Sequence, residues 1–343
     1  MVRNASTPKS ETRNQKPTAY CLLLVFITAR TIYLPAMAEA PLVTVIVPCY
    51  NSERTIQSCL TSLVNQRTSV DFEIVVVDSS SDKTAEIVER EFPAVRLIHL
   101  DKRTFAGTAR NIGIKATSAP FCFMVDSDCI AESNLIEKGI AHHKEGTYAA
   151  VGGSLRNGTP SSVSGWIGYL MEFKEYSPSS PRRLERTVPT ANVIYRRESL
   201  VRHGLFDDQM RLSEDISLNW RIYSAGEQIL FDPTMQVTHL NRTGWRAVLP
   251  YQTELGWFSA LARIRGGLPG QILVGHPALV VLMPFVRLWR AFAWLASNDR
   301  RALAVLLLIW PMYLLAGVFW AAGFFRAVTR RCADIPTGGG DAA

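Results

Sequence analysis

Two carboxylates separated by one serine end an apolar run, in the sequence FCFMVDSD over residues 121–128. The run is rich in aromatic and β-branched residues and follows Pro120, a pattern typical of a buried strand. Side chains two positions apart in an extended segment point the same way, so Asp126 and Asp128 could face one hard cation. Such triplets are also common in turns, where Asp128 would only cap the next helix. The pattern predicts either a metal site at the mouth of a sheet or a solvated turn.

Strands and helices alternate around this stretch. Strands are predicted at residues 42–47, 72–77, 95–100 and 121–125, with helices at 52–65, after Asp82 to about 92, and 107–116. Asn51 or Ser52 could cap the first helix. The alternation predicts an α/β fold, with a mostly parallel sheet covered by helices on both faces. Ligands collect at the carboxyl ends of such strands, where residues 48–51, Asp78 and residues 126–128 fall.

The alternation stops after Gly152. Residues 153–187 are rich in Ser, Gly and Pro, which is typical of a flexible loop. Beyond them the sequence predicts a strand at 191–195, helices at 198–203 and 213–225, and a strand at 228–231.

Two apolar segments, residues 268–286 and 302–325, close the chain, and the second is about long enough to cross a bilayer. Residues 242–331 hold eleven arginines, no lysine and two acids, so this part is strongly basic. Basic charge beside apolar runs indicates an anionic membrane surface rather than nucleic acid. If both segments crossed, their arginine-rich connection would violate the positive-inside tendency, so the first is expected to be interfacial or re-entrant. A buried helical hairpin or an oligomer contact is the alternative.

Five stretches follow one another in a fixed order: VIVPCYN (45–51), VVVDSSSD (75–82), GTARNIG (107–113), DSD (126–128) and SED (213–215). Each alone is a weak signal. Together they resemble the inverting, nucleotide-sugar-dependent glycosyltransferases of family 2, which have the GT-A fold. The resemblance covers residues 41–245 and makes that part the GT-A glycosyltransferase domain. It leaves a leader at 1–40, an amphipathic or transmembrane helical region at 246–331 and a disordered tail at 332–343.

The leader and the cysteines bear on the compartment. Residues 20–29 are apolar but too short to span a bilayer, and Ala36-Met37-Ala38 imitates a signal-peptide cleavage site. The six cysteines form no Cys-x-x-Cys pair and mostly lie in apolar segments, which indicates a reducing compartment.

The resemblance implies that Asp128 binds a divalent cation, Mn²⁺ or Mg²⁺, while Asp126 binds ribose or assists the metal. Such a cation neutralises the diphosphate as its bond to the sugar breaks. The implied nucleotide-sugar contacts are Pro48, Tyr50, Asn51, Glu53, Asp78, Arg110 and Asn111, with His239 and Arg242 meeting the diphosphate after closure. In isolation Asp78 would be an ordinary helix cap. Arg110 and Asn111 would be a solvated helix face.

The resemblance also implies that Asp215, with Glu214 beside it, takes the proton from the acceptor hydroxyl. The alternative is that both acids only favour a helix N-terminus through its dipole. Two departures from the family stand out. The QxxRW signature of processive synthases is absent after Asp215, where only HLNRTGW (239–245) stands nearby, so a single sugar is expected per encounter. The second stretch reads DSSS where the family often has DDGS.

The expected activity is therefore metal-dependent, inverting transfer of one sugar from a nucleotide diphosphate sugar to a saccharide or lipid-linked acceptor. We expect it in lipid-linked or surface polysaccharide or glycolipid assembly, on a membrane, with the catalytic domain in the cytoplasm. A polyprenyl-phosphate sugar synthase is the nearest variant. A nucleotidyltransferase would need a Gly- and Lys/Arg-rich loop after the first strand, which residues 48–53 do not provide. A non-catalytic nucleotide-sugar binding module is disfavoured by the acids at 214 and 215.

Overall fold

The computed structural model describes residues 40–330. The expectations for the leader, apart from its last residue, and for the tail at 332–343 lie outside the described residues.

The first half of the chain forms the parallel part of a mixed sheet. Its strands are β1 (Val43–Cys49), β2 (Phe72–Asp78), β3 (Arg96–His99) and β4 (Phe121–Val125), in the order β3–β2–β1–β4. All seven residues of β1 are buried, because helices cover both faces of the sheet. Val45 packs in the core with α1, α2 and α4, whereas Ile46 points to the core with α3, α6 and α7. The predicted α/β fold class is confirmed.

Six helices flank this sheet: α1 (Ile56–Val64), α2 (Thr84–Glu91), α3 (Ala106–Lys115), α4 (Leu135–Glu145), α6 (Arg197–Arg202) and α7 (Glu214–Ser224). The first begins four residues later than residue 52, where it was predicted, with Thr55 at its N-cap. Asn51 does not cap it. Its backbone has φ 52° and its side chain accepts a hydrogen bond from the Ser81 amide instead.

The second half of the sheet mixes directions. Here β8 (Asn192–Arg196) lies antiparallel to β4, and β6 (Ala150–Asn157) lies between β8 and β9 (Ile229–His239). The short strands β5 (Cys129–Ala131) and β7 (Arg183–Glu185) pair antiparallel with β9. Strand β9 runs much further than the predicted strand at 228–231, so it carries His239 to a position opposite Cys129.

The prediction of a flexible loop at 153–187 is wrong. This stretch holds the end of β6, helix α5 (Val163–Glu172), a 3-10 turn at Lys174–Tyr176 and β7. The Ser162 hydroxyl caps α5 by accepting a hydrogen bond from the Gly165 amide at 3.1 Å. The composition of this stretch is typical of a loop. Helix α5 is nevertheless stable, because it packs against helices far along the chain.

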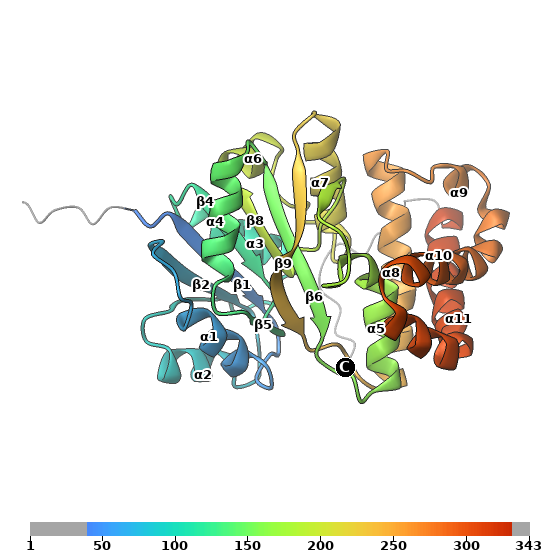
Figure 1. Cartoon of the computed structure of the whole chain (residues 1–343), viewed down its shortest axis with the longest axis horizontal. Coiled ribbons are helices and arrows are strands. Elements are labelled where there is room, and N and C mark those ends of the chain that lie inside the picture. The colour runs from blue at the N-terminus through green and yellow to red at the C-terminus, as the bar shows by residue number, and fades with distance from the viewer. Residues whose placement is uncertain (1–39, 331–343) are drawn as a thin grey trace, which may run out of the picture. The chain divides into compact units, whose positions relative to one another are not determined.

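The C-terminal third forms a helix layer with α5 at one end of the sheet (Figure 1). It comprises α8 (Trp245–Gly266), α9 (Ile272–Gly275), a 3-10 segment at Pro277–Leu282, α10 (Met283–Asn298) and α11 (Arg300–Thr329). Two stretches, Pro277–Asn298 and Arg300–Thr329, are long and apolar enough to cross a membrane. Their inner faces pack in a core, whereas Trp289 and Leu308 are 68% and 82% exposed.

Helices α8 and α11 touch backbone to backbone. A Cβ on Gly256 would overlap the carbonyl oxygen of Trp320, and a Cβ on Gly323 would overlap that of Thr253. We therefore predict that Gly256→Ala lowers the free energy of unfolding by about 1–3 kcal/mol, because the helices must separate. Thermal unfolding of the full chain in detergent measures the effect.

The matched control is Gly168→Ala on α5, where a Cβ meets nothing within 4 Å. That variant should gain up to about 1 kcal/mol, since alanine favours a helix over glycine. Equal melting temperatures for Gly256→Ala and the wild type would contradict the contact.

Candidate active site

A cavity of about 410 Å³ lies where β1 and β4 end and extends from there into the helix layer. Polar and charged side chains of both parts of the fold line it: Arg110, Asp126, Asp128, Glu172, Thr190, Arg211, Glu214, Asp215, His239, Arg242, Tyr251, Gln252 and Arg287. The strand that ends at Val125 delivers Asp126–Asp128 to this cavity, as the sequence predicts for the carboxyl edge of a sheet.

Arg110 on α3 lies at the centre of the acidic wall. Its guanidinium donates to Asp126 Oδ1 at 2.6 Å and to Glu214 Oε1 at 2.7 Å. Burial opposes its charge, but the two carboxylates outweigh this and raise the pKa of Arg110. Arg110 is therefore an internal counter-charge and not the solvated helix face that its position in isolation would suggest.

The two acids that open α7 differ in their partners. Glu214 is buried and tied to Arg110; burial and the charge of Asp215 raise the pKa of Glu214 to about 7, against the pull of Arg110. Asp215 lines the cavity, and in the described part of the chain it forms no ion pair. Burial also raises the pKa of Asp215, opposed by Arg110. The Asp215 carboxylate is thus the one left available to a substrate.

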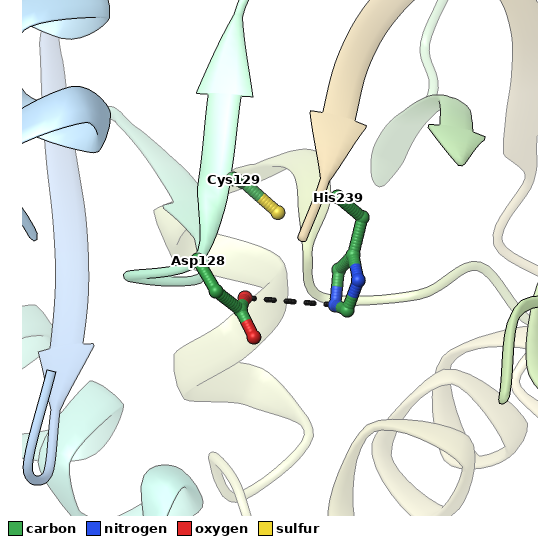
Figure 2. A group of neighbouring side chains, drawn as sticks. All are labelled: Asp128, Cys129 and His239. Atoms are coloured by element: carbon green, nitrogen blue, oxygen red, sulfur yellow. Dashed lines mark ion pairs between the residues drawn. The ribbon is translucent and has the colours of Figure 1, made fainter. Parts of the chain in front are cut away.

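Asp128 and His239 converge at the edge of the sheet. His239 Nε2 lies 3.5 Å from Asp128 Oδ1, and Figure 2 shows the two side chains pointing at each other. The Oδ1 atom is buried and has no hydrogen-bond partner among residues 40–330. His239 Nδ1 lies 3.1 Å from Asn241 Oδ1, an acceptor, so Nδ1 can donate there and Nε2 can serve as a metal ligand.

Cys129 lies close enough to complete a three-residue group with Asp128 and His239 (Figure 2). Burial, with the nearby charges of Asp128 and Asp126, raises the pKa of its thiol well above the ordinary value. A neutral thiol is a poor ligand, and Mn²⁺ and Mg²⁺ prefer oxygen. An orphaned carboxylate oxygen beside a free imidazole nitrogen fits a divalent cation, whereas the thiol does not contribute.

Asp126 does not join this group. The prediction that both carboxylates face one cation assumed that the strand continues through residue 128. Strand β4 ends at Val125, and residues 126–128 turn, with the Cys129 amide donating to the Asp126 carbonyl. The Asp126 carboxylate consequently points to Arg110.

Several predicted nucleotide contacts lie at the end of β1 and in the turn after it. Pro48 lines the cavity. Tyr50 is 40% exposed, and the Arg103 guanidinium lies 4.4 Å from the centre of its ring. Glu53 accepts a hydrogen bond from the Lys83 amide at 3.4 Å, which ties this turn, like Asn51, to the segment after β2.

The structure does not bring Asp78 and Asn111 to the cavity. Asp78 is fully buried, and its two oxygens contact the Ser80 hydroxyl and the His99 ring. Asn111 bonds the backbone of Phe206 at both the N–H and the carbonyl. Both polar side chains serve the fold, because each satisfies groups that would otherwise be buried without partners.

Sequence reasoning missed the helix-layer side of the cavity, namely Glu172, Tyr251, Gln252, Arg287 and Trp320. One signal in the sequence could have pointed to this side of the cavity: Arg287 is a charged residue within the largely apolar helix α10. Arg242 is found at the cavity, as expected from the sequence, with its guanidinium 4.2 Å from the centre of the Tyr251 ring.

Relatives of known family match the chain in part. The pre-mycofactocin glycosyltransferase of Mycobacterium tuberculosis is 26% identical over 244 residues, which cover 68% of this chain and 48% of that protein. The poly-beta-1,6-N-acetyl-D-glucosamine synthase of Staphylococcus aureus is 26% identical over 199 residues, covering 56% and 48%. The chain thus spans about half the length of these relatives.

A solved structure and a family profile agree with this. The mannosyltransferase PcManGT from Pyrobaculum calidifontis, in complex with GDP-Man and Mn²⁺, superposes with a TM-score of 0.57 at 18% identity, covering 85% of this chain and 88% of that chain. This likeness identifies the fold as GT-A. The profile described as glycosyl transferase family 2 matches residues 44–204. Residues 44–204 therefore form a domain of the glycosyl transferase family 2 type.

Proposed function

We propose that this protein is a glycosyltransferase that moves a single sugar, with inversion, from a nucleotide diphosphate sugar to a hydroxyl acceptor and requires Mn²⁺ or Mg²⁺. One observation carries the proposal: a single cavity is lined by the Asp128 carboxylate, with its orphaned oxygen, and by Asp215, a carboxylate without an ion pair. GDP-Man and Mn²⁺ bound to the mannosyltransferase of the same fold support the donor class and the cation.

Asp128 and His239 are the residues that would hold the cation. When bound, the cation supplies positive charge that stabilises the departing diphosphate. Arg110 fixes the Asp126 carboxylate beside this position, where it can bind a ribose hydroxyl. Pro48, Tyr50, Asn51 and Glu53 surround the nucleoside, and Arg242, exposed at the cavity, reaches the diphosphate.

Asp215 takes the proton of the acceptor hydroxyl as it attacks the anomeric carbon from the face opposite the diphosphate. A direct displacement of this kind inverts the anomeric centre and needs one base. Glu214 keeps Arg110 in place and so positions Asp126 and Asp215. A non-catalytic binding module would have no use for an ionisable group such as Asp215 in the cavity.

The acceptor is a saccharide or a lipid-linked saccharide, in the assembly of a lipid-linked or surface polysaccharide or glycolipid. A polysaccharide synthase among the relatives supports the polymer context. A polyprenyl-phosphate sugar synthase is a second candidate, favoured by the extension of the cavity to α10 and α11. The exposed apolar faces of these helices support a membrane location, and in this proposal the catalytic domain lies in the cytoplasm beside soluble nucleotide sugars.

The metal requirement gives the first functional prediction. Excess chelator should abolish sugar transfer, and Mn²⁺ or Mg²⁺ should restore it in the wild type but not in Asp128→Ala. His239→Ala should raise the Mn²⁺ concentration that gives half-maximal transfer, because the imidazole is lost as a ligand. Cys129→Ala is the matched control and should leave the Mn²⁺ dependence unchanged. Full transfer in excess chelator would exclude the cation.

The base gives a second prediction. Asp215→Asn keeps the shape of the side chain but cannot accept a proton, so transfer at saturating donor should slow by about 10²–10⁴-fold. Nucleotide and Mn²⁺ dissociation constants should stay within twofold. The measurement is the rate of nucleotide diphosphate release with acceptor present, beside calorimetric binding of the nucleotide.

Glu214→Gln is the control for this variant. It removes one charge partner of Arg110, so it should lower the melting temperature more than the rate. Because the pKa of Asp215 is raised, kcat/KM should fall as pH drops through a value above the ordinary range of an aspartate, and Glu214→Gln should retain that limb. A wild-type rate in Asp215→Asn with a slow Glu214→Gln would assign the base to Glu214.

Membrane association gives a third prediction. Leu308→Arg places a charge on the most exposed apolar position of α11, which is unfavourable inside a membrane by about 2.5–3.5 kcal/mol. The share of protein that sediments with membranes should therefore fall sharply. Leu184→Arg, the same change at a 55% exposed position of β7, should not alter sedimentation. A wild-type chain that stays in the supernatant without detergent would refute the membrane location.

A further inference from the structure

The inner end of the cavity is polar although it lies within the helix layer. Gln252 on α8, Arg287 on α10 and Glu172 on α5 line it together with Trp320 on α11. The outer faces of α10 and α11 are apolar and exposed. A charged residue on the inner side of an apolar helix pair needs a polar or charged partner there.

Arg287 lacks a counter-charge. Its guanidinium lies 4.6 Å from the centre of the Trp320 ring and donates to the Met171 carbonyl at 3.2 Å, while its Nε is buried without a partner. Within residues 40–330 no carboxylate forms an ion pair with it, whereas Arg110 in the same cavity has two such partners. The partly buried Arg287 guanidinium thus faces the cavity without a carboxylate partner, which leaves its charge available to an anionic ligand.

The neighbouring acids have other partners. Glu175 pairs with Lys174 at 3.5 Å and with Arg290 at 3.7 Å. Glu172 is held by the Tyr251 hydroxyl at 3.1 Å and by the Gln252 amide at 3.4 Å, and burial raises its pKa toward the neutral form. Tyr313, fully buried on α11, feels the charge of Arg287, and its hydroxyl has no partner. This hydroxyl is a second unused donor on the inner side of the helix layer.

We propose that the inner end of the cavity is an anion subsite, in which Arg287 binds a phosphate group carried by the acceptor. The subsite rests on the proposed function, since it orients the acceptor hydroxyl toward Asp215 at the other end of one cavity. The guanidinium offers two or more N–H donors to phosphate oxygens, and Trp320 keeps it flat and in place. The phosphate belongs either to a lipid phosphate or to a soluble phosphate ester.

The test is binding by the full chain in detergent and excess chelator, where no cation recruits phosphate to Asp128. Farnesyl phosphate should bind the wild type, and Arg287→Gln should weaken that binding about 10- to 100-fold through loss of a charge-assisted contact. Farnesol, which has the same chain without phosphate, should bind weakly and equally to both proteins. Arg290→Gln, a neighbouring position of α10 with its side chain 67% exposed, should match the wild type.

Two further measurements keep the proposal falsifiable. Arg287→Lys retains the charge but not the planar fork, so it should bind farnesyl phosphate with intermediate affinity even if Arg287→Gln folds poorly. UDP and GDP affinities with Mn²⁺ should stay unchanged in both variants. A loss of nucleotide affinity instead would assign Arg287 to the donor diphosphate and overturn the subsite.

Competition by inorganic pyrophosphate in the same assay distinguishes the two sources of the phosphate. Pyrophosphate that competes as well as farnesyl phosphate supports a soluble phosphate ester, and much tighter farnesyl phosphate supports a lipid. Equal binding of farnesol and farnesyl phosphate to the wild type overturns the subsite while leaving the transfer reaction untouched. If the proposed reaction is wrong, Asp215→Asn transfers sugar at the wild-type rate. The failure of the subsite and the failure of the reaction are therefore distinguishable.

Discussion

The structure depends on one buried cation, the guanidinium of Arg110, and on the two carboxylates that neutralise it. Arg110 comes from α3, Asp126 from the end of β4 and Glu214 from the start of α7, so three segments far apart in sequence meet at one charge. Arg110 and Glu214 are buried and Asp126 is partly exposed, so the buried guanidinium depends on both acids, because an uncompensated buried charge would cost several kcal/mol. The ion triad therefore fixes the separation between the sheet edge, which holds Asp128, and the helix that carries Asp215.

The sequence predicted what depends on local pattern and order along the chain. The apolar run before Asp126 gave the bounds of β4, and the alternation of strands and helices gave the parallel half of the sheet. Features that depend on register or on remote partners were not predictable. Asp128 meets His239 only because β9 extends to a position opposite Cys129, and no residue near 239 signals that pairing. Asp78 and Asn111 match nucleotide-binding positions of the family, yet here both side chains form hydrogen bonds inside the fold.

Helices α5, α8, α10 and α11 show why an apolar composition alone does not decide between a core and a membrane. One side of α11 packs in a core through Tyr313 and Phe324, and the other side exposes Leu308. The sequence offered a membrane segment and a buried hairpin as alternatives, and the helix combines an inner packed face with an outer free one. Its packed face also closes the cavity, so the helix layer is a wall of the candidate active site as well as an apolar surface.

The close packing of α8 against α11 at Gly256 and Gly323 has a geometric consequence. Direct backbone contact leaves little room for α11 to move relative to α8. Helix α8 in turn packs through Leu261 and Ala262 with Trp220 of α7, the helix that carries Asp215. A bilayer bound to the outer faces of α10 and α11 would therefore lie at a set height relative to Asp215, fixed by packing rather than by a tether. The enzyme would then transfer sugar only to those hydroxyls that an acceptor presents at that height above the lipid.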